Sequence, residues 1–293
     1  MLFKRPRLLI VGCGDVGLRV ARALRGRYRV IALTSSPQRC AELRAAGVLP
    51  LVGNLDDPAS VRRLAGLADA VLHLAPPPSA GSADPRTAHL LQALGRRRPP
   101  RCIVYGSTTG VYGDCGGAWI DETRALHPLT DRARRRVDAE ARLRWFGRVH
   151  GVRVSLLRIP GIYAADRDGG HPRERLVAGT PVLRAEDDVY TNHIHADDLA
   201  RACIAALHRG APQRVVHASD DTELRMGDYF DFAADLCGLP RPPRVSRAEA
   251  AMQMSPVRLS FMGESRRLRN QRLKRELRVT LRYPTVAEGL MPR

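Results

Sequence analysis

Short apolar runs alternate with amphipathic stretches through the first half of the chain. The apolar runs predict strands, and the stretches between them, where apolar residues recur at helical spacing, predict helices. Strands and helices in alternation indicate an α/β fold with a parallel, doubly wound (Rossmann) sheet. The predicted strands are 8–11, 29–33, 49–52, 70–74, 102–105 and 154–157, and the predicted helices are 16–26, 37–46, 58–66, 86–97 and 131–150.

The pattern loosens after residue 160, where a strand at 214–217 and helices near 196–208 and 227–237 remain visible. The Pro-rich segment 240–243 predicts a loop. We therefore expect a nucleotide-binding domain over residues 1–160. A smaller part over 161–293 should bind the substrate, with about 190–220 returning to the first domain.

A glycine pattern stands between the first predicted strand and the first predicted helix. In a dinucleotide-binding turn, the first glycine permits the turn, the second lets the backbone approach a pyrophosphate, and the third lets helix and strand pack closely. The helix N-terminus then offers free N–H groups to the phosphates. The candidate cofactor-binding residues at this turn are Gly12, Gly14, Asp15, Val16 and Gly17.

The residues after the second predicted strand bear on which dinucleotide is bound. An acidic residue there would bind the ribose 2′-hydroxyl of NAD, but the chain has Thr34, Ser35 and Ser36, followed by Arg39. Hydroxyls and an arginine suit a 2′-phosphate, so this segment favours NADP over NAD. Further cofactor contacts are expected after the third strand, at Asn54 and Leu55, and after the fourth, at Leu74, Ala75 and Pro76.

The net charge of +18 raises the question of a nucleic-acid partner. Lys4 and Lys274 are the only lysines among 48 basic residues, which leaves 46 scattered arginines and no nucleic-acid motif. We interpret them as solvated surface and expect a small-molecule substrate, neither nucleic acid nor membrane, and a monomer or homodimer.

The cysteines and the N-terminus bear on metal sites and on location. The six cysteines form no CxxC pair, which argues against zinc or a disulfide framework. The N-terminus passes directly into the first strand and leaves no room for a signal peptide, so we expect a cytoplasmic protein.

Several further motifs resemble the extended short-chain dehydrogenase/reductase superfamily, in its NAD(P)-dependent epimerase/dehydratase group. The glycine spacing GxGxxG differs from the GxxGxxG usual in extended members and is similar to atypical, YeeZ-like members. The segments that carry the resemblance are 12–17, 73–76, 107–113, 157–163, 192–199, 265–270 and 283–290.

The resemblance implies a catalytic Ser/Thr, Tyr and Lys, with the nicotinamide near Thr108, Pro160 and Ile162. Thr108 stands at the Ser/Thr position. Counting back from Glu140, the Lys position holds Arg136 and the Tyr position holds Arg132. A guanidinium stays protonated, so Arg132 is a poor general acid, whereas Arg136 keeps donors for the ribose.

The missing tyrosine leaves three hypotheses open. The chain is an NAD(P)-dependent oxidoreductase that acts on a small hydroxyl- or carbonyl-bearing substrate with another proton donor, a nucleotide-sugar epimerase or dehydratase, or a non-catalytic NADP-binding regulator. Tyr112 and Tyr163 are the candidate substitute donors, with packing as the alternative role for each. His195 titrates near neutrality but is interpreted as structural.

The scaffold of the predicted catalytic helix is intact in the sequence. Thr130 or Asp131 can cap its N-terminus. An apolar stripe is expected to face the sheet, formed by Ala133, Val137, Ala141 and Trp145.

Overall fold

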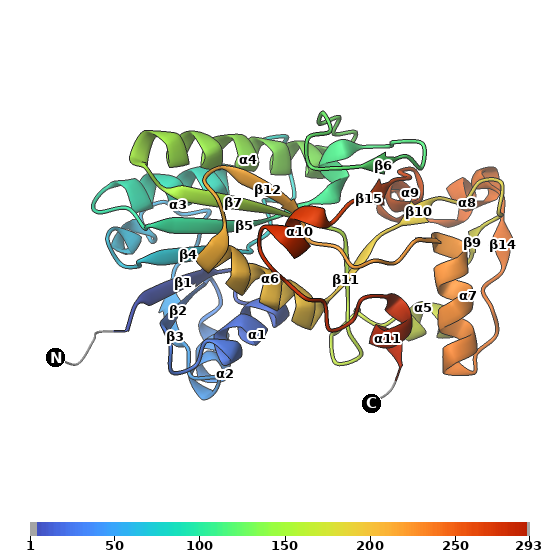
Figure 1. Ribbon diagram of the computed structural model, residues 1–293, viewed down its shortest axis with the longest axis horizontal. Coiled ribbons are helices and arrows are strands. Elements are labelled where there is room, and N and C mark those ends of the chain that lie inside the picture. Colours follow the sequence, from blue (N-terminus) through green and yellow to red (C-terminus); the bar gives the residue numbers. More distant parts are fainter. Residues whose placement is uncertain (1–4, 292–293) are drawn as a thin grey trace.

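The computed structural model describes residues 5–291 and has a seven-stranded parallel sheet at its centre (Figure 1). Lys4 and the first residues of the N-terminal segment, on which the expectation about a signal peptide rests, lie outside the described residues. The strand order is β12-β7-β5-β4-β1-β2-β3. These strands are β1 (Arg7–Val11), β2 (Arg29–Thr34), β3 (Leu49–Val52), β4 (Ala70–His73), β5 (Cys102–Thr108), β7 (Arg153–Ile159) and β12 (Arg214–His217).

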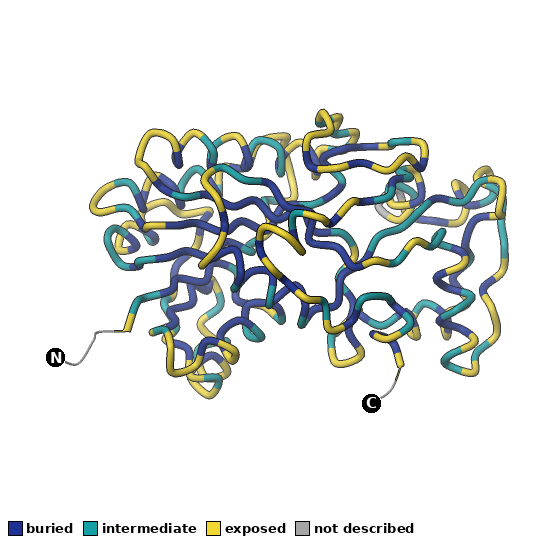
Figure 2. The backbone as a smooth tube through the Cα atoms, viewed as in Figure 1, coloured by how far each residue is buried: buried dark blue, intermediate teal, exposed yellow. Residues whose placement is uncertain are grey.

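Helices cover both faces of this sheet, which confirms the predicted doubly wound α/β class (Figures 1 and 2). In β1, Leu8 and Ile10 face one helical layer and Leu9 and Val11 face the other, because successive side chains in a strand point to opposite sides. The first layer contains α1 (Asp15–Ala23), α2 (Cys40–Ala45) and α6 (Ala196–Arg209), and the second contains α3 (Pro85–Gly95) and α4 (Asp131–His150).

Two predicted helices differ from the structure. The helix expected over 58–66 is only a single 3-10 turn at Arg62–Leu64, and the helix expected over 37–46 divides into a 3-10 turn at Pro37–Arg39 and α2. Side chains compete for the backbone before the first of these turns, since Ser60 Oγ bonds the carbonyls of Asn54 and Asp57.

A smaller part packs beyond the carboxyl ends of the central strands (Figure 1). Its strands form short pairs, and α6 and β12 return from it to the central sheet. The paired strands are β8 (Gly161–Tyr163) with β11 (His193–His195), β9 (Val182–Leu183) with β14 (Arg244–Val245), β10 (Tyr190–Thr191) with β13 (Leu224–Arg225), and β6 (Trp119–Ile120) with β15 (Arg267–Leu268). The helices of this part are α5 (Arg173–Val177), α7 (Met226–Cys237), α8 (Arg247–Gln253), α9 (Pro256–Met262) and α11 (Val286–Leu290). Helix α10 (Gln271–Arg275) packs against β12 of the central sheet.

Helix α4 begins and ends where the sequence predicts, but it turns a different face to the sheet. Thr130 Oγ1 accepts the Ala133 N–H at the N-terminus, which confirms the predicted cap. The expected stripe is wrong at its C-terminal end, because Trp145 is 59% exposed and Ala141 is also exposed. The buried positions instead include Ala139, Glu140, Leu143 and Phe146.

Candidate active site

The three glycines of the turn between β1 and α1 have the geometry that a pyrophosphate needs. Gly12 has φ +84°, and a Cβ there would lie 2.4 Å from the Ala75 backbone nitrogen. A Cβ on Gly17 would lie 3.3 Å from Ile10 Cγ2, so strand and helix are in close contact. A Cβ on Gly14 would meet nothing within 4 Å, which leaves open space beside the backbone at the start of α1. The residues present therefore fit a bound dinucleotide.

A cavity of about 320 Å³ opens beside this turn, at the carboxyl ends of β1, β4, β5 and β7. Most of the predicted cofactor contacts line it together. They are Gly12, Gly14, Asp15, Val16, Gly17, Leu74, Thr108, Arg136, Pro160 and Ile162.

The remaining predicted cofactor contacts lie outside this lining. They are Thr34, Ser35, Ser36, Arg39, Asn54, Leu55, Ala75 and Pro76, which follow the ends of β2, β3 and β4 at the same sheet edge. Arg39 reaches back to the glycine turn, where its Nη1 donates to the Cys13 carbonyl at 2.9 Å. Its Nη2 pairs with Glu42 at 3.1 Å, so the acid nearest the end of β2 is already bound by the arginine.

The sequence analysis missed several residues of this cavity: Gly106, Ser107, Ile159, Arg167 and Leu199. Gly106 adjoins the segment 107–113, and Ser107, Ile159 and Leu199 lie within the segments that carry the family resemblance. Arg167 lies in the loop after β8, which no motif marks. Its Nη1 is 3.4 Å from Asp15 Oδ2, and its buried Nε has no hydrogen-bond partner among the described residues.

Arg136 extends from α4 to the end of β5. Its Nη1 donates to the Tyr105 hydroxyl and to the Gly106 carbonyl, both at 2.9 Å. The guanidinium is thereby held at the wall of the cofactor cavity, in the position where the resemblance expects a ribose contact.

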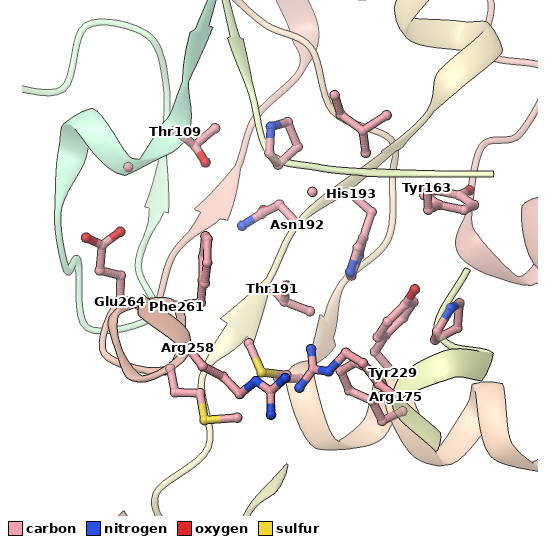
Figure 3. Close-up of a pocket in the computed structure, with 18 of the residues that line it drawn as sticks. Thr109, Tyr163, Arg175, Thr191, Asn192, His193, Tyr229, Arg258, Phe261 and Glu264 are labelled. Carbon is pink, nitrogen blue, oxygen red and sulfur yellow. The ribbon is translucent and has the colours of Figure 1, made fainter. Parts of the chain in front are cut away.

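A second cavity, of about 360 Å³, adjoins the first (Figure 3). Thr108, Pro160 and Ile162 line both cavities, so the two meet at the ends of β5 and β7. Thr108 Oγ1 accepts the Gly110 N–H at 3.3 Å. Arg132 also lines the second cavity, and its Cζ lies 4.3 Å from the centre of the Phe261 ring.

The two tyrosines considered as proton donors lie in different surroundings. Tyr163 lines the second cavity, and its hydroxyl donates to the Thr285 carbonyl at 3.2 Å. Burial raises the pKa of Tyr163. Tyr112 is 1% exposed and lines neither cavity, which provides no route by which its hydroxyl reaches a substrate.

Tyr112 belongs instead to a buried network behind the site. Arg158 Nη1 donates to the Tyr112 hydroxyl at 2.7 Å, and that hydroxyl lies 2.5 Å from His217 Nε2. Burial lowers the pKa of His217 to about 3, so the ring is neutral. Because His217 Nδ1 bonds the Arg269 carbonyl, Nδ1 carries the proton and Nε2 accepts from the tyrosine.

His195 also has a structural position. It precedes α6, where its Nδ1 accepts the Asp197 N–H at 3.2 Å, and its ring stacks on Tyr283. The two following acids hold separate parts of the chain together. Asp197 binds Arg19 of α1 at 2.5 Å, and the buried Asp198 accepts the Arg282 and Tyr283 N–H groups at 2.9 Å.

The described residues also bear on metal binding, on the state of the cysteines and on membrane insertion. Residues 5–291 contain no cluster of His, Cys, Asp or Glu arranged to hold a metal ion. All six cysteines are free thiols, and Cys13, Cys102 and Cys203 are buried. None of the helices within the described range has both the length and the apolar character needed to cross a bilayer. The cytoplasmic location and the oligomeric state stay predictions.

A glycine turn at the switch point of a doubly wound sheet, with a cavity beside it, defines a Rossmann-type dinucleotide-binding protein. The model of the NAD dependent epimerase/dehydratase family matches residues 8–218, and the chain belongs to this family.

Individual relatives cover nearly the whole chain. A dTDP-4-dehydrorhamnose reductase from Mycobacterium tuberculosis is 26% identical over 284 aligned residues, which span 91% of this chain and 87% of the relative. A solved structure from Silicibacter pomeroyi, described as a functionally unknown conserved protein, is 33% identical with a TM-score of 0.81 and covers 97% of this chain and 96% of its own. A dTDP-glucose 4,6-dehydratase from Streptomyces venezuelae, solved with NAD, is 22% identical with a TM-score of 0.78, covers 97% and 94%, and shares the fold.

Proposed function

We propose that this protein is an NAD(P)-dependent oxidoreductase, with NADP preferred, that acts on a small molecule bearing a hydroxyl or carbonyl group. The observation that carries the proposal is the junction of the two cavities at Thr108, Pro160 and Ile162. A cofactor on the glycine turn and a substrate in the second cavity would meet there. The reductase named among the relatives, which aligns with 91% of this chain, supports reduction more than epimerisation.

A bound nicotinamide dinucleotide would supply hydride transfer at this junction. The chain's own residues bind and orient the reactants. The turn at Gly14 and the N–H groups at the start of α1 would hold the pyrophosphate, and Arg136 would bind the ribose. Arg39 would bind the 2′-phosphate, because it lies beside the turn and a phosphate can displace its exposed partner Glu42 from the guanidinium.

The charge that develops on the substrate oxygen requires a stabilising group. Thr108 contributes a hydroxyl at the junction, and Arg132 contributes a permanent positive charge to the wall of the same cavity. We do not propose Tyr112 as a donor, because it lines neither cavity. We do not propose Tyr163 either, since its hydroxyl already donates to the Thr285 carbonyl. In this proposal water supplies the proton.

The test is a fluorescence titration with NADPH and NADH, followed by NADPH oxidation assays over a panel of carbonyl compounds. NADPH should bind more tightly than NADH, and at least one carbonyl should be reduced. If neither nucleotide binds at millimolar concentration, the proposal fails. If NADPH binds but is never oxidised, a non-catalytic regulator is the better interpretation.

A double variant tests whether the site is an altered epimerase. Arg132→Tyr with Arg136→Lys restores the residue types that the resemblance implies. Conversion of a sugar nucleotide by this variant, and not by the natural chain, would favour the epimerase hypothesis over the reductase.

A further inference from the structure

We propose that the second cavity contains an oxyanion subsite formed by Arg175 and Arg258, which binds a carboxylate or phosphate group of the substrate. That the bound group belongs to a substrate rests on the proposed function, but binding of an anion to the subsite can be tested without any turnover. The two guanidinium groups come from different helices, α5 and α9, and lie along the same wall of the cavity (Figure 3).

Arg175 is a largely buried cation that lacks an acidic partner. Its Nε and Nη2 atoms are buried and have no hydrogen-bond partner among residues 5–291. Its Cζ lies 4.2 Å from the centre of the Phe230 ring, so the ring supports the guanidinium from one side. Withdrawing N–H donors from water without new partners is unfavourable, and a ligand that accepts from them would remove that cost.

Arg258 lines the same cavity and brings a second positive charge near Arg175, in place of an acidic partner. Burial and the nearby charge of Arg258 lower the pKa of Arg175 to about 10, which remains well above neutrality. Arg175 is therefore cationic under ordinary conditions. No ion pair of either arginine occurs in the part of the chain that the structure describes.

Several other buried arginines of this protein have acidic partners. Arg158 is held by Glu140 at 2.7 Å, and Arg19 binds three aspartates. Within the second cavity, Arg266 is paired with Glu264 at 2.7 Å. Arg135, another buried arginine, has no acidic partner but donates to the Gly81 carbonyl. Arg175 differs from all of these because no side-chain hydrogen bond of its guanidinium occurs among the described residues.

The charges that line the cavity sum to a positive total. Its lining contains four arginines and two glutamates, 4 − 2 = +2, and one glutamate is already bound to Arg266. The other, Glu174, is exposed. A planar guanidinium can bind two oxygens of one carboxylate or phosphate, and two guanidinium groups suit a dianion better than a monoanion.

The position of the subsite suggests how a substrate would lie. Arg175 and Arg258 line the same cavity as Thr108. A substrate whose oxyanion binds the two arginines would present its hydroxyl or carbonyl group to Thr108 at the junction with the cofactor cavity. The same subsite could bind the phosphates of a nucleotide-linked substrate. The probes must therefore separate a small carboxylate or phosphate from a nucleoside diphosphate.

The experiment is calorimetric titration of the full chain with three probes: inorganic phosphate, malonate and UDP. Each titration is run with NADPH at saturation, so that the glycine turn is not available to the anion. The variants are Arg175→Gln and Arg258→Gln. The matched control is Arg173→Gln, because Arg173 is exposed, lies on the same helix as Arg175 and does not line the cavity.

At least one probe should bind, and each test variant should weaken it by about tenfold or more, while the control retains the natural affinity. The probe that binds most tightly identifies the source of the oxyanion. The unfolding temperature of the variants separates a binding role of Arg175 from a purely structural one. Arg175→Gln should keep or raise that temperature, because it removes an unpaired buried cation.

The subsite is overturned if no probe binds, or if binding is the same in Arg175→Gln as in the natural chain. NADPH affinity, measured on the same variants, should not change. Loss of anion binding with intact NADPH binding refutes the subsite alone. Failure of NADPH to bind, with anion binding intact in its absence and lost in Arg175→Gln, refutes the proposed function alone.

Discussion

Arg158 of β7 and Glu140 of α4 form a buried ion pair in which each side chain is only 2% exposed. Two hydrogen bonds join them, Arg158 Nε to Glu140 Oε1 at 3.1 Å and Nη2 to Oε2 at 2.7 Å. Glu140 Oε1 also accepts the Ser107 hydroxyl at 2.7 Å. The pair therefore connects the helix that carries Arg132 and Arg136 to the ends of the strands where the two cavities meet.

Replacing one member of this pair should cost more than replacing both. Glu140→Ala leaves the Arg158 charge buried without its partner and should lower the free energy of unfolding by about 3–5 kcal/mol. The double variant Glu140→Leu with Arg158→Met should lose clearly less. Urea denaturation measures both, and an equal loss in the two variants would contradict this account.

Two glycines of the turn should respond in opposite ways. Gly14→Ala should keep the stability of the natural chain, because φ is −84° and a Cβ meets nothing within 4 Å, yet it should weaken NADPH binding by intruding on the pyrophosphate space. Gly12→Ala should lower the free energy of unfolding by at least about 1–2 kcal/mol, because its φ of +84° is unfavourable for residues with a Cβ. Thermal unfolding measures the stability of both variants, and titration with NADPH measures their affinity for the cofactor. Full NADPH affinity in a folded Gly14→Val variant would argue against a cofactor at this turn.

Arg39 should determine the preference for NADP over NAD. Arg39→Gln should weaken NADPH binding by about tenfold or more, the value of a charge-assisted hydrogen bond, and leave NADH affinity nearly unchanged. The control is Arg44→Gln, since Arg44 is an exposed arginine of the neighbouring helix α2. Equal losses for NADPH and NADH would show that Arg39 acts through the shape of the turn and not through a phosphate.

Stability should fall as the solution is acidified below about pH 6.5. Burial lowers the pKa values of His73, His193 and His217 to about 3, compared with 6.5 for a free histidine. Between those values the unfolded chain binds protons that the folded chain does not, so stability is complete above pH 6.5 and is lost as pH falls toward 3.

Each of these histidines contributes up to about 1.4 kcal/mol per pH unit. His217→Asn, which retains a donor near Nδ1, should lower stability at pH 7 and flatten the dependence between pH 6 and 4 by about one proton. Urea denaturation at several pH values gives the slope. An unchanged slope would mean that His217 is protonated in the folded protein.

The sequence alone determined the central architecture. The apolar runs at 8–11, 29–33 and 102–105 are continuous because their strands are covered on both faces, and continuous burial leaves a pattern that can be recognised. The glycine turn was equally clear: Gly12 and Gly17 lack room for a side chain, and Gly14 leaves the space that a pyrophosphate needs. Leu74 followed from the parallel topology, whereas Thr108 and Pro160 were expected from the family resemblance.

The tertiary structure alone decided which face of α4 is buried and where the charged groups meet. The predicted apolar stripe places Trp145 inside, yet Trp145 is exposed and Glu140 is buried, because Arg158 on the strand beneath neutralises the charge of Glu140. Likewise Arg175 and Arg258, more than eighty residues apart in the chain, share one cavity wall only because α5 and α9 pack around it. Local sequence encodes backbone preference and burial pattern, whereas the pairing of distant charges depends on packing that no local pattern contains.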